Sequence, residues 1–385
     1  NKYNKNKIIK SYEIRCIQHC AIITFTVYKQ GYRFQELFTD SGQLLFNLEG
    51  NTLTVTASDA ETRLVTSVDV MNAQGAGLFA VSAKILLDPL KELPEQPLTF
   101  DINDENLEIF IHFQNGKYNF IGQKGDTYPQ QKPLNDNAIS ISMDAQMLLN
   151  GISRSLFATA DDELRPVMNG VYFDIHTDDL TFVASDGHKL VRLRNLAVKS
   201  PERASFILPK KPANLLKNLL AKESEQVLIK FDDNNAYITC TNFEMVCRLI
   251  EGRYPNYNSV IPQENPFKVT IDRISFLNAL KRVSVFSNPA SSLVKLHLKD
   301  SLITVSAQDI DFSTSAEERI VCQFDGTELS IGFKATYLIE ILGNISSEEV
   351  VLELADPSRA GLIVPSENDE DEDLLMLLMP MMLND

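Results

Sequence analysis

The sequence contains an internal repeat. Residues 53–59 (LTVTASD) recur as residues 180–186 (LTFVASD) and, more loosely, as residues 302–309, so that the closing aspartates at 59, 186 and 309 lie 127 and 123 residues apart. A second marker agrees, because residues 125–129 (GDTYP) resemble residues 252–255 (GRYP). Two independent markers with one spacing predict three tandem units, which we place at residues 1–129, 130–255 and 256–385.

Each unit shows a mixed pattern of strands and helices. Alternating β-branched stretches, such as residues 107–113, 236–241 and 295–305, are typical of strands separated by polar turns. Helices are expected where apolar residues recur on one face, at residues 145–158, 212–221, 274–286 and 335–342. Strand-rich units with two amphipathic helices packed on a sheet define an α+β fold, repeated three times.

The composition excludes several classes of protein. Apolar residues make up 44% of the chain and charged residues 23%, which is normal for a globular protein. The longest apolar run, residues 374–383, is about half the length of a membrane span and contains Pro380. The five cysteines form no CxxC pair, and the histidines are scattered singly, so we expect reduced thiols, no metal and no cofactor. A cytoplasmic protein without a membrane segment is the default expectation.

The net charge of -16 argues against nucleic-acid binding unless the basic residues are concentrated in one place. Lys84, Lys211 and Lys334 follow the repeat spacing, at the expected start of the second helix of each unit. A lysine there opposes the helix dipole, whereas helix N-termini and lysines together attract phosphate. The residues that we expect to face a phosphate backbone are Lys84, Arg154, Lys210, Lys211, Lys217, Arg273, Lys281, Arg282 and Lys334.

Four motifs carry a resemblance to a known family. Residues 165–171 (RPVMNGV), 185–190 (SDGHKL), 247–257 (CRLIEGRYPNY) and 378–381 (LMPM) resemble, in order and spacing, segments of the bacterial DNA polymerase III beta subunit, the sliding clamp. The resemblance spans about residues 46–385. It implies a head-to-tail homodimer whose six repeats form a ring around double-stranded DNA, with basic helices inside, where it contacts phosphates without reading sequence.

The resemblance also implies partners and sites. The partners are the DNA polymerase III alpha subunit, the clamp loader and other proteins with a clamp-binding motif, and the chain would associate with the nucleoid during replication. Short peptides of these partners would enter an apolar groove. Carried over to this sequence, the groove residues are Met168, Ser185, Gly187, His188, Leu190, Pro255, Val260, Leu377, Met379, Pro380 and Met381. Ser259 and Met382 stand where many relatives have arginine, so the polar rim is expected to differ.

The same resemblance implies dimer contacts. Tyr118 and Phe120 of the first unit match positions that meet the region of Val285 and Phe286 in the third unit of a second copy. Taken one at a time, each of these four residues is as typical of an ordinary core.

Two other functions remain open at this stage. Ser185 and Asp186 with His188 suggest a hydrolase, although such close sequence neighbours rarely have the required geometry, and Asp186-Gly187 is typical of a turn. Tandem β-rich units would also suit a repeat-built adhesive or ligand-binding protein. The acidic run at residues 367–373 lacks the ligand spacing of an EF-hand and is expected to be a solvated loop. The ring-forming clamp is the preferred interpretation, as a non-catalytic subunit of the polymerase holoenzyme.

The N-terminal region departs from the family. Residues 1–45 carry seven basic and three acidic side chains, and residues 13–45 show neither the family's first helix nor a clean periodicity. Codons permitted for residues 12–45, read one nucleotide later, can encode a sequence that looks like a clamp N-terminus with an initiator Met, a helix and a strand. We therefore hypothesise that residues 1–11 are upstream sequence and that residues 12–45 are an out-of-frame reading, which we expect to pack poorly.

Overall fold

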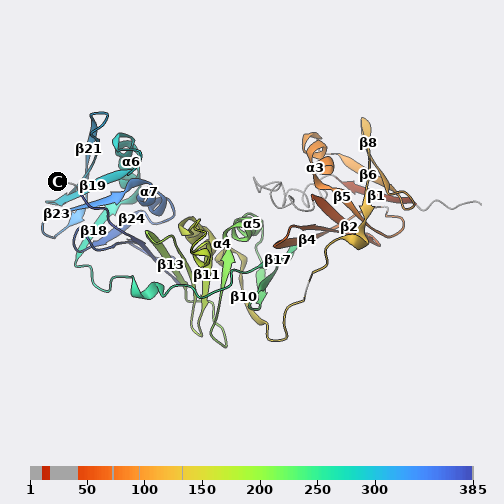
Figure 1. Cartoon of the computed structure of the whole chain (residues 1–385), viewed down its shortest axis with the longest axis horizontal. Coiled ribbons are helices and arrows are strands. Elements are labelled where there is room, and N and C mark those ends of the chain that lie inside the picture. Colours follow the sequence, from red (N-terminus) through yellow and green to blue (C-terminus); the bar gives the residue numbers. More distant parts are fainter. Residues whose placement is uncertain (1–10, 18–41, 72, 95, 132, 384–385) are drawn as a thin grey trace, which may run out of the picture. The chain divides into compact units, whose positions relative to one another are not determined.

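The computed structural model describes residues 11–17 and 42–383, apart from positions 72, 95 and 132, with the backbone alone for residues 11–17. Its contacts divide the chain into two compact units, Asn1–Leu148 with Asn214–Leu249 and Leu149–Ala213 with Ile250–Asp385 (Figure 1). Each unit contains one nine-stranded and one four-stranded antiparallel sheet. The predicted α+β class is confirmed.

Every repeat contributes two sets of four antiparallel strands. The A sets have the orders β5 (Gly77–Ser82), β2 (Gln43–Glu49), β3 (Thr52–Ser58), β4 (Thr62–Asp69); β14 (Ala204–Pro209), β11 (Gly170–Ile175), β12 (Leu180–Ser185), β13 (Lys189–Asn195); and β23 (Leu329–Lys334), β19 (Leu293–Lys299), β20 (Leu302–Asp309), β21 (Thr314–Val321). The three orders match strand for strand. The repeated LTVTAS-type motif is thus the second-to-last strand of each A set.

The B sets repeat in the same way. Their orders are β1 (Ser11–Ile17), β6 (Pro97–Asn103), β7 (Glu108–Phe113), β8 (Gly116–Ile121); β10 (Ile139–Asp144), β15 (Gln226–Phe231), β16 (Asn235–Thr239), β17 (Phe243–Arg248); and β18 (Phe267–Asp272), β24 (Glu349–Leu354), β25 (Gly361–Pro365), β26 (Glu372–Leu378). The short strands β9 (Gln123–Lys124) and β22 (Gln323–Phe324) extend the sheets beside β5 and β18. Three sequence repeats therefore fold as three copies of one topology.

Adjacent repeats are joined by pairing between end strands. The end strand β17 of one B set pairs antiparallel with the end strand β4 of an A set, and β26 pairs with β13 in the same manner. Each junction fuses two four-stranded sets, which form a nine-stranded sheet together with β9 or β22. The second repeat consequently contributes its B set to the first compact unit and its A set to the other.

Four predicted helices are confirmed within a few residues. The helices are α3 (Ala83–Glu92), α4 (Ala145–Ser155), α5 (Lys210–Leu220), α6 (Arg273–Val283) and α7 (Ala335–Gly343), with the 3-10 turns η1 (Gly125–Thr127), η2 (Leu156–Ala158), η3 (Pro166–Met168), η4 (Tyr257–Ser259) and η5 (Ser284–Phe286). Their apolar faces lie in the core: Leu148 and Ile152 of α4 and Leu216 of α5 are fully buried. None of the helices in the described residues is both long and apolar enough to cross a membrane.

The N-terminal expectation falls mostly outside the described residues. Residues 1–10 and 18–41 lie outside the described residues, but residues 11–17 form the regular strand β1, which pairs antiparallel with β6 from Ser11 with Asn103 to Ile17 with Pro97. Residues 43–45 belong to β2, paired on both sides. A regular backbone ladder tolerates many side chains, because its hydrogen bonds join main-chain groups. Strand formation alone therefore does not require the natural sequence at this position.

Candidate peptide groove and candidate DNA-facing helices

The turn between β12 and β13 is built by side chains that cap main-chain groups. The Ser185 hydroxyl donates to the Lys189 carbonyl at 2.9 Å and accepts the Gly187 N–H at 3.1 Å. Asp186 Oδ1 accepts the N–H groups of His188 and Lys189 at 2.8 and 2.9 Å. Gly187 has a φ of 90°, which explains the glycine. The hydroxyl of Ser185 is thus engaged in the turn, as expected for a structural role, and the hydrolase alternative loses its nucleophile.

The C-terminal segment meets this turn. Leu190 of β13 stands opposite Leu377 of β26, and the Met379 N–H donates to the His188 carbonyl at 2.8 Å. Two residues later the Met381 N–H donates to the Gly332 carbonyl of β23, also at 2.8 Å. The C-terminal segment is therefore held by main-chain bonds on both sides of Pro380.

A buried apolar cluster underlies the meeting point. Its members are Val183, Leu190, Ile207, Tyr254, Tyr257, Ile261, Ala360, Leu362, Leu375 and Leu377, with Val167, Tyr172, Ile250 and Val364 packed against them. The rings of Tyr172 and Tyr254 stack with centroids 4.6 Å apart. Burial raises the pKa of Tyr254 and of Tyr257 well above the ordinary value for tyrosine, so both phenols stay neutral.

A pocket opens beside this cluster. It has a volume of about 600 Å³ and is lined by Ser259, Val260, Ile261, Pro262, Gln263, Glu264, Arg359, Ala360 and Met379. The side chains of Val260 and Met379 are 57% and 45% exposed, although both are large and apolar. Exposed apolar side chains around a concave surface are typical of a site that binds an apolar group of a partner.

The starts of three helices are structurally equivalent. In each repeat the N–H of the first helical residue donates to the carbonyl of the residue that directly precedes a strand of the A set. The three bonds run from Ala83 to Gly42, from Lys210 to Asn169 and from Ala335 to Ser292. By this criterion Lys84 corresponds to Lys211, and both side chains are exposed at the second position of a helix. Lys334 lies two positions earlier, as the last residue of β23. The expectation of one common position therefore holds for two lysines only.

Two arginines of the expected DNA-facing set are occupied elsewhere. Arg154 Nη1 donates to Glu372 Oε2 at 2.7 Å, and the same guanidinium also pairs with Asp369, leaving the side chain 15% exposed. Arg273 donates to the carbonyls of Ser347 at 2.7 Å and Leu342 at 3.2 Å, at the end of α7. A guanidinium engaged by carboxylates or helix-terminal carbonyls has few donors left for phosphate, so contact of these two arginines with DNA stays a prediction that the geometry does not favour.

The other basic residues of that set keep at least partial exposure. Lys281 is exposed, Lys217 is half-buried, and Lys210 pairs with Asp161 at 2.6 Å. Arg282 is 62% exposed and pairs with Glu318 through two bonds, at 2.9 and 2.6 Å. Lys334 lies 4.6 Å from the centroid of the Tyr337 ring.

Comparison with known proteins identifies the family. Models of the DNA polymerase III beta subunit match the chain in three parts: the N-terminal domain over residues 41–132, the central domain over 142–256 and the C-terminal domain over 258–382. The chain belongs to the DNA polymerase III beta subunit family.

Similar proteins carry the name beta sliding clamp. That of Pseudomonas aeruginosa is 28% identical over 341 residues, covering 88% of this chain and 91% of the relative, and that of Haemophilus influenzae is 27% identical over 343 residues, with the same coverage. Among solved structures, a DNA polymerase sliding clamp from Pseudomonas aeruginosa superposes with a TM-score of 0.86 at 26% identity, covering 97% of this chain and 100% of the other. This membership does not favour the adhesive alternative.

The structure places most of the groove residues expected for this clamp family around one site. Pro255, Val260, Met379, Pro380 and Met381 are at least partly exposed, and His188 is 69% exposed. Leu190 and Leu377 are 3% exposed and form the floor rather than the rim. Met168 is also buried, and its neighbour Val167 packs against the cluster in its place.

Three further residues stand at the site without having been expected. Lys189 is 5% exposed and pairs with Glu340, and its ammonium lies 4.5 Å from the Tyr337 ring. The His188 ring lies 6.2 Å from that of Tyr337, and Arg359 lines the pocket. Tyr337 and Arg359 belong to none of the four sequence motifs, whereas Lys189 lies within one. Their positions depend on contacts between distant segments.

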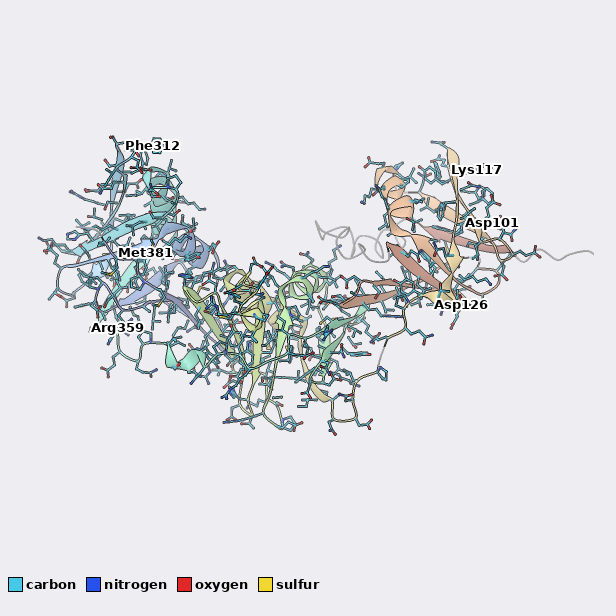
Figure 2. The ribbon with its side chains drawn as sticks, in the orientation of Figure 1. Asp101, Lys117, Asp126, Phe312, Arg359 and Met381 are labelled. Atoms are coloured by element: carbon cyan, nitrogen blue, oxygen red, sulfur yellow. The ribbon has the colours of Figure 1, made fainter. Side chains whose placement is uncertain are left out.

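The expected dimer residues lie on or beside the end strands of two sheets. Tyr118 and Phe120 are half-buried on β8, the last strand of its sheet, next to Ile121, which is 76% exposed. Val285 and Phe286 are 77% and 41% exposed on η5, which contacts the other end strand, β21. Ile310 and Phe312 are 80% and 75% exposed in the turn between β20 and β21, where Figure 2 labels Phe312. Val285 and Phe286 are thus exposed rather than part of a core, while Tyr118 and Phe120 are half-buried, and the dimer contacts stay a prediction.

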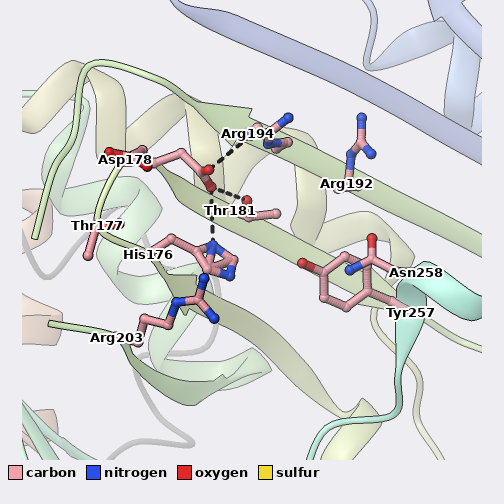
Figure 3. A pocket seen from close by; sticks show the side chains of 10 residues that line it. His176, Thr177, Asp178, Thr181, Arg192, Arg194, Arg203, Tyr257 and Asn258 are labelled. Atoms are coloured by element: carbon pink, nitrogen blue, oxygen red, sulfur yellow. Dashed lines mark hydrogen bonds and ion pairs between the residues drawn. The ribbon is translucent and has the colours of Figure 1, made fainter.

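A second pocket, of about 290 Å³, is lined mainly by polar side chains, several of which pair with one another (Figure 3). Asp179, which is 7% exposed, accepts hydrogen bonds from Arg194 at 2.9 Å and Thr181 at 2.8 Å and lies 3.4 Å from His176. Burial alone would raise its pKa, but the hydrogen bonds and the charge of Arg194 outweigh burial, so the pKa of Asp179 lies below its usual range. Charges paired in this way stabilise the fold locally. The described residues contain no cluster of three or more potential metal ligands.

Proposed function

We propose that the chain is a DNA sliding clamp that closes around double-stranded DNA as a head-to-tail homodimer. In this role it tethers the DNA polymerase III alpha subunit, the clamp loader and other proteins with a clamp-binding motif, and it is itself a non-catalytic subunit. Membership of the DNA polymerase III beta subunit family supports this role, and the similar proteins are named beta sliding clamps. A cytoplasmic location with association to the nucleoid belongs to the same proposal.

The observation that carries the dimer is the repeated junction between end strands. β17 pairs with β4, and β26 pairs with β13. The strands equivalent to these partners are β8, the end of the first B set, and β21, the end of the third A set. Within the described residues each is an edge strand with one neighbour. An open edge strand presents unpaired main-chain groups that pair readily with a second strand. Pairing β8 of one copy with β21 of another repeats the junction a third time.

The internal junctions also predict the register of this third junction. In the first, Glu244 of β17 stands opposite Val65 of β4. In the β7–β8 hairpin Glu108 stands opposite Ile121, and in the β16–β17 hairpin Asn235 stands opposite Arg248. When these two pairs are aligned, Lys117 is the equivalent of Glu244. In the β3–β4 hairpin Thr56 stands opposite Val65, and in the β20–β21 hairpin Ser306 stands opposite Glu317. When these two pairs are aligned, Glu317 is the equivalent of Val65. Lys117 of one copy therefore lies opposite Glu317 of the other, and opposite charges across a strand pair are stabilising.

DNA would lie against the helix starts that carry Lys84 and Lys211. Both side chains are exposed there, and the proposal retains Lys210, Lys217, Lys281, Arg282 and Lys334 as supporting charges. Contacts to phosphate alone carry no sequence information, so a closed ring can move along the duplex. The acidic remainder of the chain, with a net charge of -16 overall, disfavours adsorption of DNA on other surfaces.

A charge exchange tests the dimer. Lys117→Glu and Glu317→Lys each place like charges opposite one another, so we expect each to weaken dimerisation about fivefold, the upper range for an exposed pair. The double variant restores the pair and should recover most of the loss, measured by sedimentation at low ionic strength. Lys268→Glu with Glu353→Lys reverses another ion pair, on β18 and β24 rather than on the two edge strands, and should leave dimerisation unchanged. Two single losses that simply add in the double variant would contradict this register.

A further inference from the structure

The pocket beside Met379 contains one cation whose role is not explained by the fold. Arg359 lies on the turn between β24 and β25, and its side chain is exposed (Figure 2). We propose that Arg359 makes the groove selective for peptides that carry a carboxylate beside their apolar anchor. This inference rests on the groove assigned under the proposed function and adds a chemical preference to it.

The walls of the pocket are tied together before any peptide binds. The buried Asn265 amide donates to the carbonyl oxygens of Glu353 and Ala360 at 2.9 and 3.1 Å, which joins the segment after η4 to the β24–β25 turn. Arg359 Nη1 donates to the Glu264 carbonyl at 3.0 Å, so the guanidinium itself spans the same two segments. A donor that is already oriented loses less entropy when it binds a ligand.

The rest of the lining is suited to an apolar side chain. Val260 and Met379 are exposed at the rim, while Ile261 and Ala360 are 8% and 7% exposed and form part of the floor. A leucine or phenylalanine of a peptide would bury apolar surface here, and removing that surface from water favours binding. The guanidinium then lies at the edge of an apolar contact, where a charged hydrogen bond is partly shielded from solvent.

The guanidinium of Arg359 has no direct carboxylate partner among the described residues. Among the described residues no carboxylate oxygen lies within 4.0 Å of its guanidinium nitrogens, whereas Arg165 pairs with Asp162 at 2.8 Å and Lys189 pairs with Glu340. Asp356, on the same turn, is engaged instead by the Ser358 hydroxyl at 2.6 Å and by two main-chain N–H groups. Hydrogen bonds from Ser358 lower the pKa of Asp356 most, and the main-chain N–H and then the charge of Arg359 lower it further.

The remaining donors of Arg359 are therefore suited to a carboxylate from outside. A guanidinium offers five N–H donors in a planar fork, of which one has a partner here, and this fork matches a carboxylate. An Asp or Glu side chain next to the anchor and the free C-terminus of a peptide present the same chemistry. Glu264 also lines the pocket, and its negative charge repels a carboxylate from either source. It therefore reduces the preference for a carboxylate, and removing its charge should have the opposite effect to removing the charge of Arg359.

Three fluorescein-labelled probes separate these sources. They are the amidated peptide Gly-Asp-Leu-Phe-Gly, its Asn form with an amide terminus, and the Asn form with a free C-terminal carboxylate. With the full-length chain at low ionic strength, we expect the Asp peptide to bind about fivefold more tightly than the amidated Asn peptide, and the difference should shrink at high salt. A gain in the third probe alone would assign the carboxylate to the peptide terminus and equally support the proposal.

Variants of the two opposing charges complete the test. Arg359→Gln should reduce the preference for a carboxylate to about one while leaving the affinity for the amidated Asn peptide within about twofold, and Glu264→Gln should increase the preference. Lys268→Gln, which removes the same charge from an exposed lysine of β18 that does not line the pocket, should leave the preference unchanged. Equal binding of all three probes to the unmodified chain, or an unchanged preference in Arg359→Gln, would overturn the inference. Failure of every probe to bind would contradict the groove itself, and the inference with it.

Discussion

The main-chain N–H of Met379 donates to the carbonyl oxygen of His188 at 2.8 Å, which continues the β13–β26 ladder one step past its last paired residues. This bond brings the C-terminal methionines to the turn that carries Gly187 and His188. Met379 remains 45% exposed, and the His188 side chain 69% exposed. An unbranched thioether that is held at its main chain but not at its side chain can adapt to several partner side chains.

Removing this segment should abolish peptide binding without opening the dimer. A chain that ends at Leu378 loses Met379 and the main-chain bond to His188, whereas the β8 and β21 edges are untouched.

Met379→Asp should weaken peptide binding at least about tenfold, because a charge replaces a rim contact of the apolar pocket. Met71→Asp, at another exposed methionine, is the matched control. Anisotropy with an apolar peptide and sedimentation measure the two properties. Native peptide affinity in the truncated chain would refute the groove.

Reversing Lys84 and Lys211 to Glu should shorten retention on circular DNA and flatten its salt dependence. Each lost phosphate contact should reduce the slope of log affinity against log salt by about 0.9. Because exposed charges contribute little to stability, the midpoint of urea unfolding should change little. Lys268→Glu with Lys299→Glu gives the same change in net charge at exposed strand positions. An unchanged salt slope would remove the two lysines from the DNA-facing surface.

Asp179 should contribute to the acid sensitivity of the second compact unit. Its pKa is lowered in the folded state, so its stabilising effect is present above the pKa of the unfolded chain, near 4, and is lost as the pH falls through the folded value. Asp179→Asn should cost about 1–3 kcal/mol at pH 7 and give a shallower loss of stability below pH 4. Urea unfolding between pH 2.5 and 7 measures this. The exposed neighbour Asp178→Asn is the control, and an equal effect of both changes would contradict the assignment.

The N-terminal hypothesis predicts a lesion in the gene. Sequencing across codons 10–48 should reveal one nucleotide lost near Leu45. In a chain made from the corrected reading frame, the first repeat should unfold at a higher temperature. The family model for the N-terminal domain begins to match at residue 41, close to the expected point of departure. The pairing of residues 43–45 of β2 on both sides is the observation against the hypothesis. A confirmed reading without a single-base lesion would defeat it.

The repeat made much of the fold predictable. Leu53, Leu180 and Ile303 occupy buried positions on β3, β12 and β20, and a recurring strand motif implies a recurring neighbourhood. The spacing also placed Lys84 and Lys211 correctly. It misplaced Lys334 by two positions, because the β20–β21 hairpin and the strands after it differ in length from the other repeats and a fixed offset ignores such insertions.

Side-chain partners were not predictable in the same way. Arg154 resembles any surface arginine of a helix, and its burial depends on Glu372 and Asp369, which are more than two hundred residues away. The position of Arg359 depends on a carbonyl ninety-five residues earlier in the chain. Periodicity reports which face of an element is apolar, but not which distant charge meets it.

The most direct test of the clamp assignment is retention on DNA before and after linearisation. The chain is loaded by a clamp loader on nicked circular DNA, free protein is removed, and a restriction enzyme then opens the circle. A ring held by topology should remain on the circle and leave the linear DNA from its ends, and blocking both ends with bound protein should prevent that loss. Retention on unblocked linear DNA equal to retention on the circle would show site-bound attachment and contradict the account.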